Sequence, residues 1–309
     1  KFLKVLNRQR QSEGSGQVIV WTCVMGQCCS SPRKPTPPGA DETTPIYFNN
    51  VLLPRGSRPE DLASLELFCA RAPDCGYKDY PRALRFIRAR KHVLDDALKL
   101  WCLDQEWRVC DNIAGILDEP VDPVVENVIA AHYAPVLLGT RSREGDRLVM
   151  YRNVGDLNVE TLNKATGVDT SHLLRRHMRE MERLRREMDA DAKGAGALGG
   201  HVSILDCEGT SVLKFVGARA FWTSISSLDG NHFAEMLGAL IIINPPPMTM
   251  WAVNTIKPWM DPTTAAKIIV RNGKPSEFLH EYFSSADVAG LPEHLRPVAV
   301  GAQVGASRV

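Results

Sequence analysis

Hydrophobic residues recur three or four positions apart from Arg58 to about Asp111, and this spacing breaks near Pro73 to Gly76. The recurring positions are Leu62, Leu65, Phe68, Leu84, Ile87, Leu94, Ala97, Leu98 and Trp101. Such spacing places the apolar side chains on one face of a helix. The pattern therefore predicts about three short helices that pack into a small helical lobe.

The pattern changes beyond Pro120, where extended runs alternate with helical segments. The extended runs are Arg147–Asn153, His201–Leu205, Leu240–Asn244 and Ile268–Val270. Strands that alternate with helices usually form a parallel sheet covered by those helices. We expect an α/β fold, with a helical N-terminal lobe followed by a mixed, mostly parallel sheet.

The first 45 residues show neither a helical nor a strand-like spacing of hydrophobic residues. They contain Gly14-Ser15-Gly16 and the proline-rich stretch Pro32–Pro38. This composition is typical of a disordered arm. The predicted organisation is an arm over 1–45, a helical lobe over 56–115, a sheet domain over 120–297 and a flexible tail over 298–309.

The composition limits the function classes. The chain has 309 residues, of which 44% are hydrophobic, and its 37 Lys and Arg against 36 Asp and Glu give a formal net charge of +1. A nucleic-acid-binding protein that relies on bulk positive charge is therefore not expected. No apolar run reaches the roughly 18 residues of a membrane-spanning helix.

The sequence shows no signature of a catalytic or metal site. The eight cysteines form no CxxC pair, which favours reduced thiols over a zinc module or a disulfide scaffold. Gly194–Gly200 is rich in Gly and Ala but lacks the Lys-Ser/Thr of a phosphate-binding loop. We expect a protein that is not an enzyme and uses no cofactor or metal.

An arginine-rich segment, Ser171–Asp189, also carries acidic residues and an apolar stripe. Arginines and carboxylates interleave on one side of the predicted helix, as on a solvated amphipathic helix. We therefore expect its charged face to lie in solvent, with an anionic membrane surface as the alternative.

Several stretches between Pro59 and Leu295 resemble the CRAL-TRIO lipid-binding family, and in particular its phosphatidylinositol/phosphatidylcholine transfer branch. They are Leu84–Lys91, Glu144–Tyr151, Ile204–Gly209, His232–Gly238, Ile241–Pro246, Lys257–Pro262 and Thr264–Ile268. The resemblance implies a sheet that floors an apolar lipid cavity, closed by a movable helix. It also implies phosphatidylinositol as a bound ligand.

Four charged residues are candidates for the headgroup site. Glu235 and Lys257 lie in or beside apolar stretches, where an unpaired charge would be costly, so they either form ion pairs or face a polar ligand. The resemblance implies that they bind a phosphoinositide headgroup together with Arg90 and Lys91 of the helical lobe.

A second candidate group lies on the strands. His201 and Ser203 are two residues apart on one predicted strand, so their side chains share a face. The resemblance implies that these positions, with Tyr151, line the cavity for a second ligand. His201 stands where the family has a hydroxyl residue, which leaves open a phosphate contact, a haem ligand or a packed histidine.

The apolar segment from Pro247 to Met260 is rich in Met and Trp, which adapt to soft apolar surfaces. The residues alone are compatible with a core helix. The resemblance implies a gate that opens onto the bilayer through Met248, Trp251, Ile256 and Trp259.

A separate motif, Met25-Gly26-Gln27-Cys28-Cys29-Ser30, fits the pattern for N-myristoylation of Gly26 with palmitoylation of Cys28 and Cys29. Modification of Gly26 requires that Met25 is the translation start. A chance match to this short pattern is the alternative.

We therefore expect a cytoplasmic, monomeric lipid-binding or lipid-transfer protein, peripheral on the cytosolic face of membranes. It would hold phosphatidylinositol and a second hydrophobic ligand. The alternatives are a carrier of a retinoid, tocopherol, sterol or haem, or a lipid-regulated adaptor for a lipid kinase or trafficking partner.

Overall fold

The computed structural model describes residues 46–72, 74–155, 157–190, 196–247, 249, 253 and 265–296. The predicted arm, the tail and the acylation motif at Gly26, Cys28 and Cys29 lie outside these residues. So do Lys257 and the gate residues Met248, Trp251, Ile256 and Trp259.

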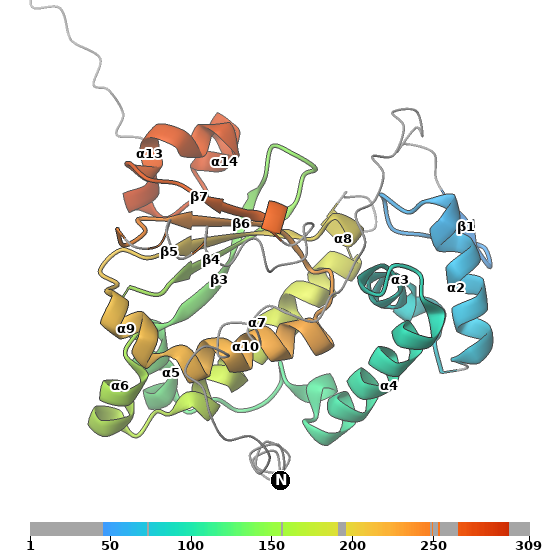
Figure 1. The fold of residues 1–309 in the computed structure, drawn as a ribbon, viewed down its shortest axis with the longest axis horizontal. Coiled ribbons are helices and arrows are strands. Elements are labelled where there is room, and N and C mark those ends of the chain that lie inside the picture. Colours follow the sequence, from blue (N-terminus) through green and yellow to red (C-terminus); the bar gives the residue numbers. More distant parts are fainter. Residues whose placement is uncertain are drawn as a thin grey trace, which may run out of the picture.

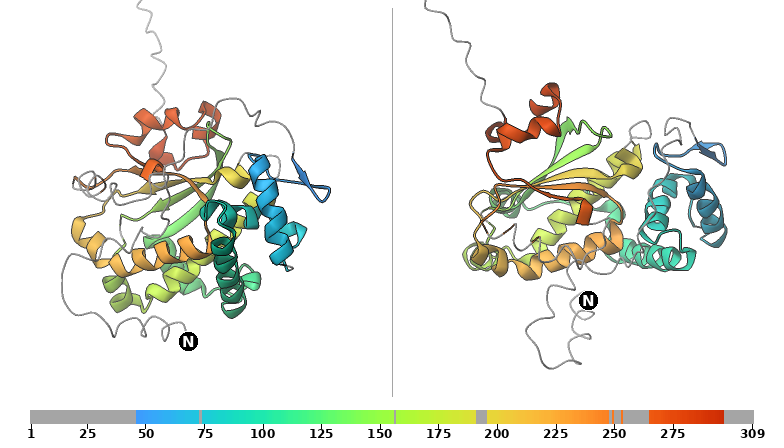
Figure 2. Two further views of the ribbon diagram at one scale, coloured as in Figure 1. Left: turned by 45° about the vertical axis from the view of Figure 1, so that its right-hand side comes forward. Right: turned by 45° about the horizontal axis from the view of Figure 1, so that its top comes forward.

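The N-terminal part of the described chain is a helical lobe, which stands beside the sheet in Figures 1 and 2. Its elements are β1 (Tyr47–Phe48), β2 (Val51–Leu52), α2 (Pro59–Arg71), η2 (Tyr77–Asp79), α3 (Tyr80–Ala89), α4 (Leu94–Cys110) and η3 (Ile113–Gly115). Trp101 is the centre of its core and packs edge-to-face on Phe68 and Phe86, with ring centroids 5.5 and 5.9 Å away. The prediction of about three short helices is confirmed.

The rest of the described chain forms a five-stranded sheet with helices on both faces. The elements are α5 (Pro123–His132), β3 (Ala134–Arg141), β4 (Leu148–Asn153), α6 (Val159–Thr166), α7 (Thr170–Ala190), α8 (Gly196–Gly199), β5 (His201–Asp206), α9 (Val212–Gly217), α10 (Arg219–His232), β6 (Leu237–Ile243), β7 (Ile268–Val270), α13 (Pro275–Phe278), η5 (Leu279–Glu281), α14 (Ser285–Val288) and η6 (Glu293–Leu295). The strand order is β3-β4-β5-β6-β7, and only the β3–β4 pair is antiparallel. The predicted α/β fold with a mixed, mostly parallel sheet is confirmed.

The two faces of this sheet bury different partners. Alternate residues of β4, β5 and β6, such as Val149 and Ile204, pack with Phe283 and the other apolar residues of the C-terminal segment 278–295. We call this the C-terminal face. The intervening residues, such as Met150, face α7 and α10 and pack with Met181 and Leu228. We call this the α7/α10 face, and both layers are visible in Figure 1.

Much of the charged face of α7 is buried, although Arg183 and Glu187 are exposed, so the prediction that this face lies in solvent is wrong for most of it. Glu182 is only 1% exposed and forms ion pairs with Arg185 at 2.7 Å and with Arg108 of α4 at 3.1 Å. Asp189, near the end of α7, pairs with the buried Arg85 of α3. These pairs join α7 to the helical lobe, which the local spacing of charges could not reveal because the partners are 74 and 104 residues away.

Candidate functional site

His201 occupies the first position of β5 on the α7/α10 face and is only 2% exposed. Gly200 before it has φ +75°, and a Cβ there would lie 2.4 Å from the backbone nitrogen of Gly238, so the turn requires glycine. This close approach lets both the backbone N–H and Nδ1 of His201 donate to the carbonyl of Met236, at 2.7 and 2.6 Å.

The hydrogen bond to Met236 fixes the proton of the His201 imidazole. A carbonyl only accepts, so Nδ1 carries the hydrogen and Nε2 of the neutral ring presents a lone pair. Burial and the nearby positive charge of Arg152 lower the pKa of His201 to about 4. His201 is therefore neutral at physiological pH.

Ser203 and Arg152 lie on the same face as His201. Ser203 is 1% exposed and pairs in register with Met150, whereas Arg152 is two residues beyond Met150 on β4. The Nη2 atom of Arg152 lies 3.3 Å from the sulfur atoms of Met150 and Met181, which are weak acceptors. Among the described residues, His201 Nε2, Ser203 Oγ and Arg152 Nε have no hydrogen-bond partner.

A second buried histidine lies nearby, with its partners satisfied. His177 of α7 places Nε2 2.8 Å from Oδ1 of Asp229 and Nδ1 3.2 Å from the hydroxyl of Tyr133. Although burial raises it, the pKa of Asp229 is lowered overall by His177 and by the charge of Arg152. Asp229 thus balances Arg152 at longer range, without an ion pair between them within the described residues.

Tyr151 does not join His201 and Ser203, because it lies on the C-terminal face. Tyr151 is opposite Ile204 in the β4–β5 pair, and Ile204 points to the other face of the sheet from Ser203. The hydroxyl of Tyr151 donates to Oδ2 of Asp206 at 2.9 Å. The predicted grouping of Tyr151 with His201 and Ser203 is therefore wrong. Burial and the neighbouring Asp206 carboxylate raise the pKa of Tyr151.

Asp206 is fully buried and is the acceptor for four donors. Besides Tyr151, His294 Nε2 lies 3.0 Å from Oδ2, and the Asn244 amide and the Glu208 backbone N–H donate to Oδ1 at 2.9 and 3.0 Å. Asp206, Glu208 and His294 bring ligand atoms within 4.8 Å of one another, as a metal site would. Four donors already occupy the acceptor positions of the carboxylate, however, so this geometry serves hydrogen bonding.

The candidate headgroup residues are only partly described. Glu235 has φ +55° in the turn before β6, and its Oε2 lies 3.1 Å from Nζ of Lys267, a residue that the sequence did not single out. Arg90 and Lys91 follow α3, and Ala234 packs in the same apolar cluster as that helix. The turn that carries Glu235 thus adjoins the lobe that carries Arg90 and Lys91.

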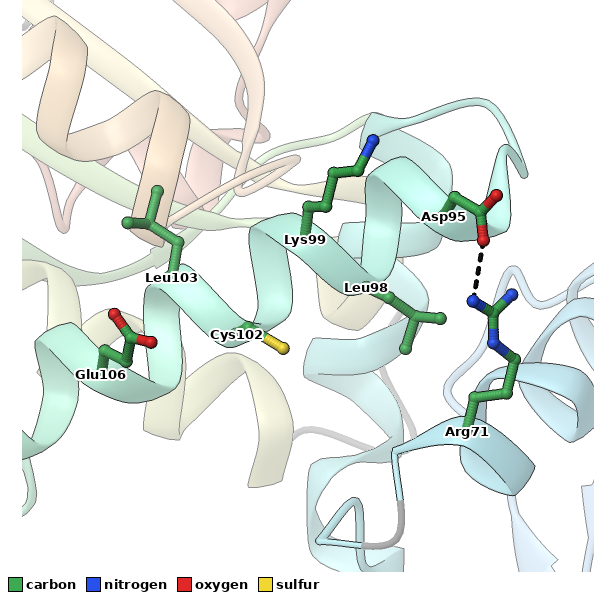
Figure 3. Close-up of a pocket in the computed structure, with 7 residues that line it drawn as sticks. All are labelled: Arg71, Asp95, Leu98, Lys99, Cys102, Leu103 and Glu106. Carbon is green, nitrogen blue, oxygen red and sulfur yellow. Dashed lines mark ion pairs between the residues drawn. The ribbon is translucent and has the colours of Figure 1, made fainter.

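A depression of about 550 Å³ lies between α2 and α4 on the helical lobe (Figure 3). It is lined by Arg71, Asp95, Leu98, Lys99, Cys102, Leu103 and Glu106. Arg71 and Asp95 form an ion pair of 2.8 Å across it. Four charged side chains among seven make this depression unsuited to acyl chains, and none of its lining residues belongs to a strand of the sheet.

Within the described residues, no helix combines the length and the apolar character needed to cross a bilayer.

The sequence of residues 136–289 matches the CRAL/TRIO domain family. The chain carries a CRAL/TRIO domain. This domain contains the whole sheet face with His201, Ser203 and Arg152, and the resemblance stated from the sequence motifs is confirmed.

Similar individual proteins agree with this assignment. The phosphatidylinositol/phosphatidylcholine transfer protein SFH9 of Arabidopsis thaliana is 28% identical over 264 residues, which cover 83% of this chain and 43% of that protein. The SEC14 cytosolic factor of Kluyveromyces lactis is 27% identical over 216 residues, which cover 68% of this chain and 70% of that protein. The chain thus spans less than half the length of SFH9.

The crystal structure of Sfh5 has the same fold, with a TM-score of 0.50 and 16% identity over 66% of this chain and 68% of that chain. This likeness supports the CRAL/TRIO architecture of a helical lobe and a mostly parallel sheet.

Sequence reasoning missed Arg152 and Lys267. A signal for Arg152 was present, because an arginine within the apolar strand Leu148–Asn153 is unusual. No local signal marks Lys267 as the partner of Glu235, since their contact joins segments 32 residues apart.

Proposed function

We propose that this protein holds a phospholipid, with phosphatidylinositol among its ligands, and transfers it between membranes. The observation that carries the proposal is the CRAL/TRIO domain over residues 136–289 in a chain similar to proteins named as phosphatidylinositol/phosphatidylcholine transfer proteins. A lipid carrier lowers a large barrier, because roughly 30 methylenes at about 0.8 kcal/mol each oppose the passage of a bare diacyl lipid through water.

The proposed headgroup site consists of Arg90, Lys91, Glu235 and Lys257. Arg and Lys supply charge and donors to phosphate, which suits an inositol phosphate. Support comes from the packing of Ala234 against the helical lobe, which brings the Glu235 turn toward Arg90 and Lys91. The Glu235–Lys267 ion pair favours a competing, purely structural role for Glu235.

The proposed route of exchange is a gate formed by Met248, Trp251, Ile256 and Trp259, which enters the interfacial zone of the bilayer. Membrane residence would be transient, or stable if Gly26, Cys28 and Cys29 carry acyl chains, because one myristoyl chain alone binds marginally. We propose a monomer that acts on the cytoplasmic side of membranes without catalysis.

The deciding experiment measures transfer of labelled phosphatidylinositol between vesicles. Lys257→Ala should reduce phosphatidylinositol transfer by about tenfold to a hundredfold, because a charge-assisted contact to phosphate is lost. The matched control is Lys164→Ala, which removes a 73% exposed lysine on α6. No transfer by the unaltered protein would contradict the proposed function.

The same preparation distinguishes the alternatives. Mass spectrometry of ligands extracted from the protein purified from cells would reveal a retinoid, tocopherol, sterol or haem instead of a phospholipid. A protein that retains phospholipid but does not transfer it would act as a lipid-regulated adaptor for a kinase or trafficking partner.

A further inference from the structure

Three buried polar atoms on the α7/α10 face of the sheet have no hydrogen-bond partner within the described residues. They are Nε2 of His201, Oγ of Ser203 and Nε of Arg152. The Arg152 side chain is half-buried, and its Nη2 atom lies 3.3 Å from the sulfur atoms of Met150 and Met181. His201 and Ser203 are at least 98% buried. An unsatisfied buried polar atom destabilises a fold, so three of them on one face indicate groups that are satisfied by a ligand.

The three groups lie on the same face of two adjacent strands. Ser203 is directly opposite Met150 in the parallel β4–β5 pair, and Arg152 Nη2 reaches the sulfur of that same Met150. His201 is two residues before Ser203 on the same face, and the charge of Arg152 acts on its imidazole. The groups therefore lie together in a layer that contains Met and Leu side chains and the buried His177–Asp229 pair.

Each group demands a different feature of the ligand. Arg152 supplies positive charge and several donors, so it requires an anion with acceptor oxygens. Ser203 adds a hydroxyl group, which can donate a hydrogen bond to an oxygen of the ligand. His201 is neutral with its hydrogen on Nδ1, so Nε2 accepts and requires a hydrogen donated by the ligand.

A phosphate monoester meets all three demands. Its second ionisation lies near pH 6, and burial beside a single guanidinium favours the singly charged form, which keeps one P–O–H group. We propose that Arg152, Ser203 and His201 bind the terminal phosphate monoester of a diacyl lipid held against this face of the sheet. This inference rests on the proposed lipid-holding function and names a ligand class for the sheet site.

The same chemistry disfavours other ligands. A choline phosphodiester has no P–O–H to donate to His201, and its quaternary ammonium would face the charge of Arg152. A carboxylate can pair with Arg152 but leaves Nε2 of His201 unsatisfied. Asp229 contacts His177 and already interacts with the charge of Arg152, so its negative charge disfavours a doubly charged phosphate at this site.

The test is competitive loading from vesicles that contain equal mole fractions of phosphatidic acid, phosphatidylcholine and phosphatidylinositol with matched acyl chains. The bound lipids are then extracted and quantified by mass spectrometry. The unaltered protein should load phosphatidic acid about tenfold or more over phosphatidylcholine. Arg152→Met, which keeps the apolar volume, should abolish this preference.

The control is Arg183→Met, which removes one positive charge from a 47% exposed arginine of α7 and should keep the preference. Ser203→Ala, which removes one donor, should lower phosphatidic acid loading about threefold to tenfold. Thermal denaturation of each variant, together with its loading of phosphatidylinositol, separates loss of the site from loss of the fold.

The outcomes are distinct. If phosphatidylinositol loads but phosphatidic acid gains nothing over phosphatidylcholine, the phosphate-monoester site is wrong and the proposed function stands. If no phospholipid loads at all, the proposed function itself fails. Oleic acid that loads as well as phosphatidic acid, or soluble glycerol 3-phosphate that binds as tightly, would overturn the assignment to a phosphorylated diacyl lipid.

Discussion

The two faces of strands β4 and β5 carry polar groups in opposite states. On the C-terminal face, the fully buried Asp206 accepts hydrogen bonds from four donors, among them the hydroxyl of Tyr151. On the α7/α10 face, His201, Ser203 and Arg152 retain polar atoms without partners in the described part of the chain. Both clusters include residues of β5, where Ser203 and Asp206 are only three residues apart.

This difference separates a structural network from a candidate ligand site. A saturated network stabilises the fold because every buried polar atom recovers the hydrogen bonds that it loses on leaving water. Groups without partners do not recover them, and such groups persist where they serve a ligand. The comparison therefore predicts that substitutions on the C-terminal face affect stability, whereas those on the α7/α10 face affect lipid selectivity.

The largest effect is expected for Asp206→Ala. Removal of this acceptor leaves Tyr151, Asn244 and the Glu208 N–H without their partner, so the free energy of unfolding should fall by about 3 kcal/mol or more. Urea denaturation measures the change. A loss below about 1 kcal/mol would mean that the network is not what stabilises this face.

A pH dependence of similar size is expected from His201. Its pKa is about 4 in the fold, against 6.5 for an ordinary histidine, so below pH 6.5 the unfolded chain takes up a proton that the folded protein does not. Stability should therefore fall by about 3 kcal/mol as pH decreases from about 6.5 to 4.

His201→Gln should remove this part of the pH profile of urea denaturation. The control His172→Gln, at a side chain that is 43% exposed, should leave the profile intact. Identical profiles for the His201 variant and the unaltered protein would show that His201 does not remain neutral in the fold.

A smaller effect is expected for Tyr151→Phe, which removes one donor to Asp206 and should reduce the free energy of unfolding by about 1–2 kcal/mol. The raised pKa of Tyr151 adds a pH signature. Above about pH 10 the unfolded chain ionises this group before the fold does, so stability falls with rising pH.

The Tyr151→Phe variant should show less of this alkaline loss in denaturation curves. Tyr77→Phe, at a residue that is 58% exposed, is the matched control. An equal alkaline loss in both variants would assign the effect to other groups.

The smallest effect on stability is expected for Ser203→Ala. The hydroxyl has no partner to lose, so the free energy of unfolding should change by less than about 0.5 kcal/mol or should rise. Calorimetry of the protein stripped of lipid measures this. A loss comparable to that of Tyr151→Phe would show that Ser203 is part of a structural network.

Much of the secondary structure could be predicted from local pattern. The four extended runs coincide with β4, β5, β6 and β7 to within a few residues, because alternating or continuous apolar stretches leave few other conformations. The strand β3 was missed. It contains Pro135 and lies at the sheet edge, where a proline is tolerated and the apolar pattern is weak.

The candidate site could be predicted only in part. The shared face of His201 and Ser203 follows from the alternation of a single strand, which is a local property. The placement of Tyr151 required the register between β4 and β5, and a shift of one residue moves a side chain to the other face. Parallel strands have no hairpin that would fix this register in the sequence.

The sequence by itself therefore determined the helical lobe, four of the five strands of the β3–β7 sheet and the family motifs, since these depend on residues near one another along the chain. Only the tertiary structure decided that the α7 charges are buried against α3 and α4 and that Lys267 pairs with Glu235. It also decided which polar atoms are satisfied around Asp206 and which are not around Arg152. These outcomes depend on contacts between distant segments, whose geometry is set by packing of the whole fold and leaves no local pattern.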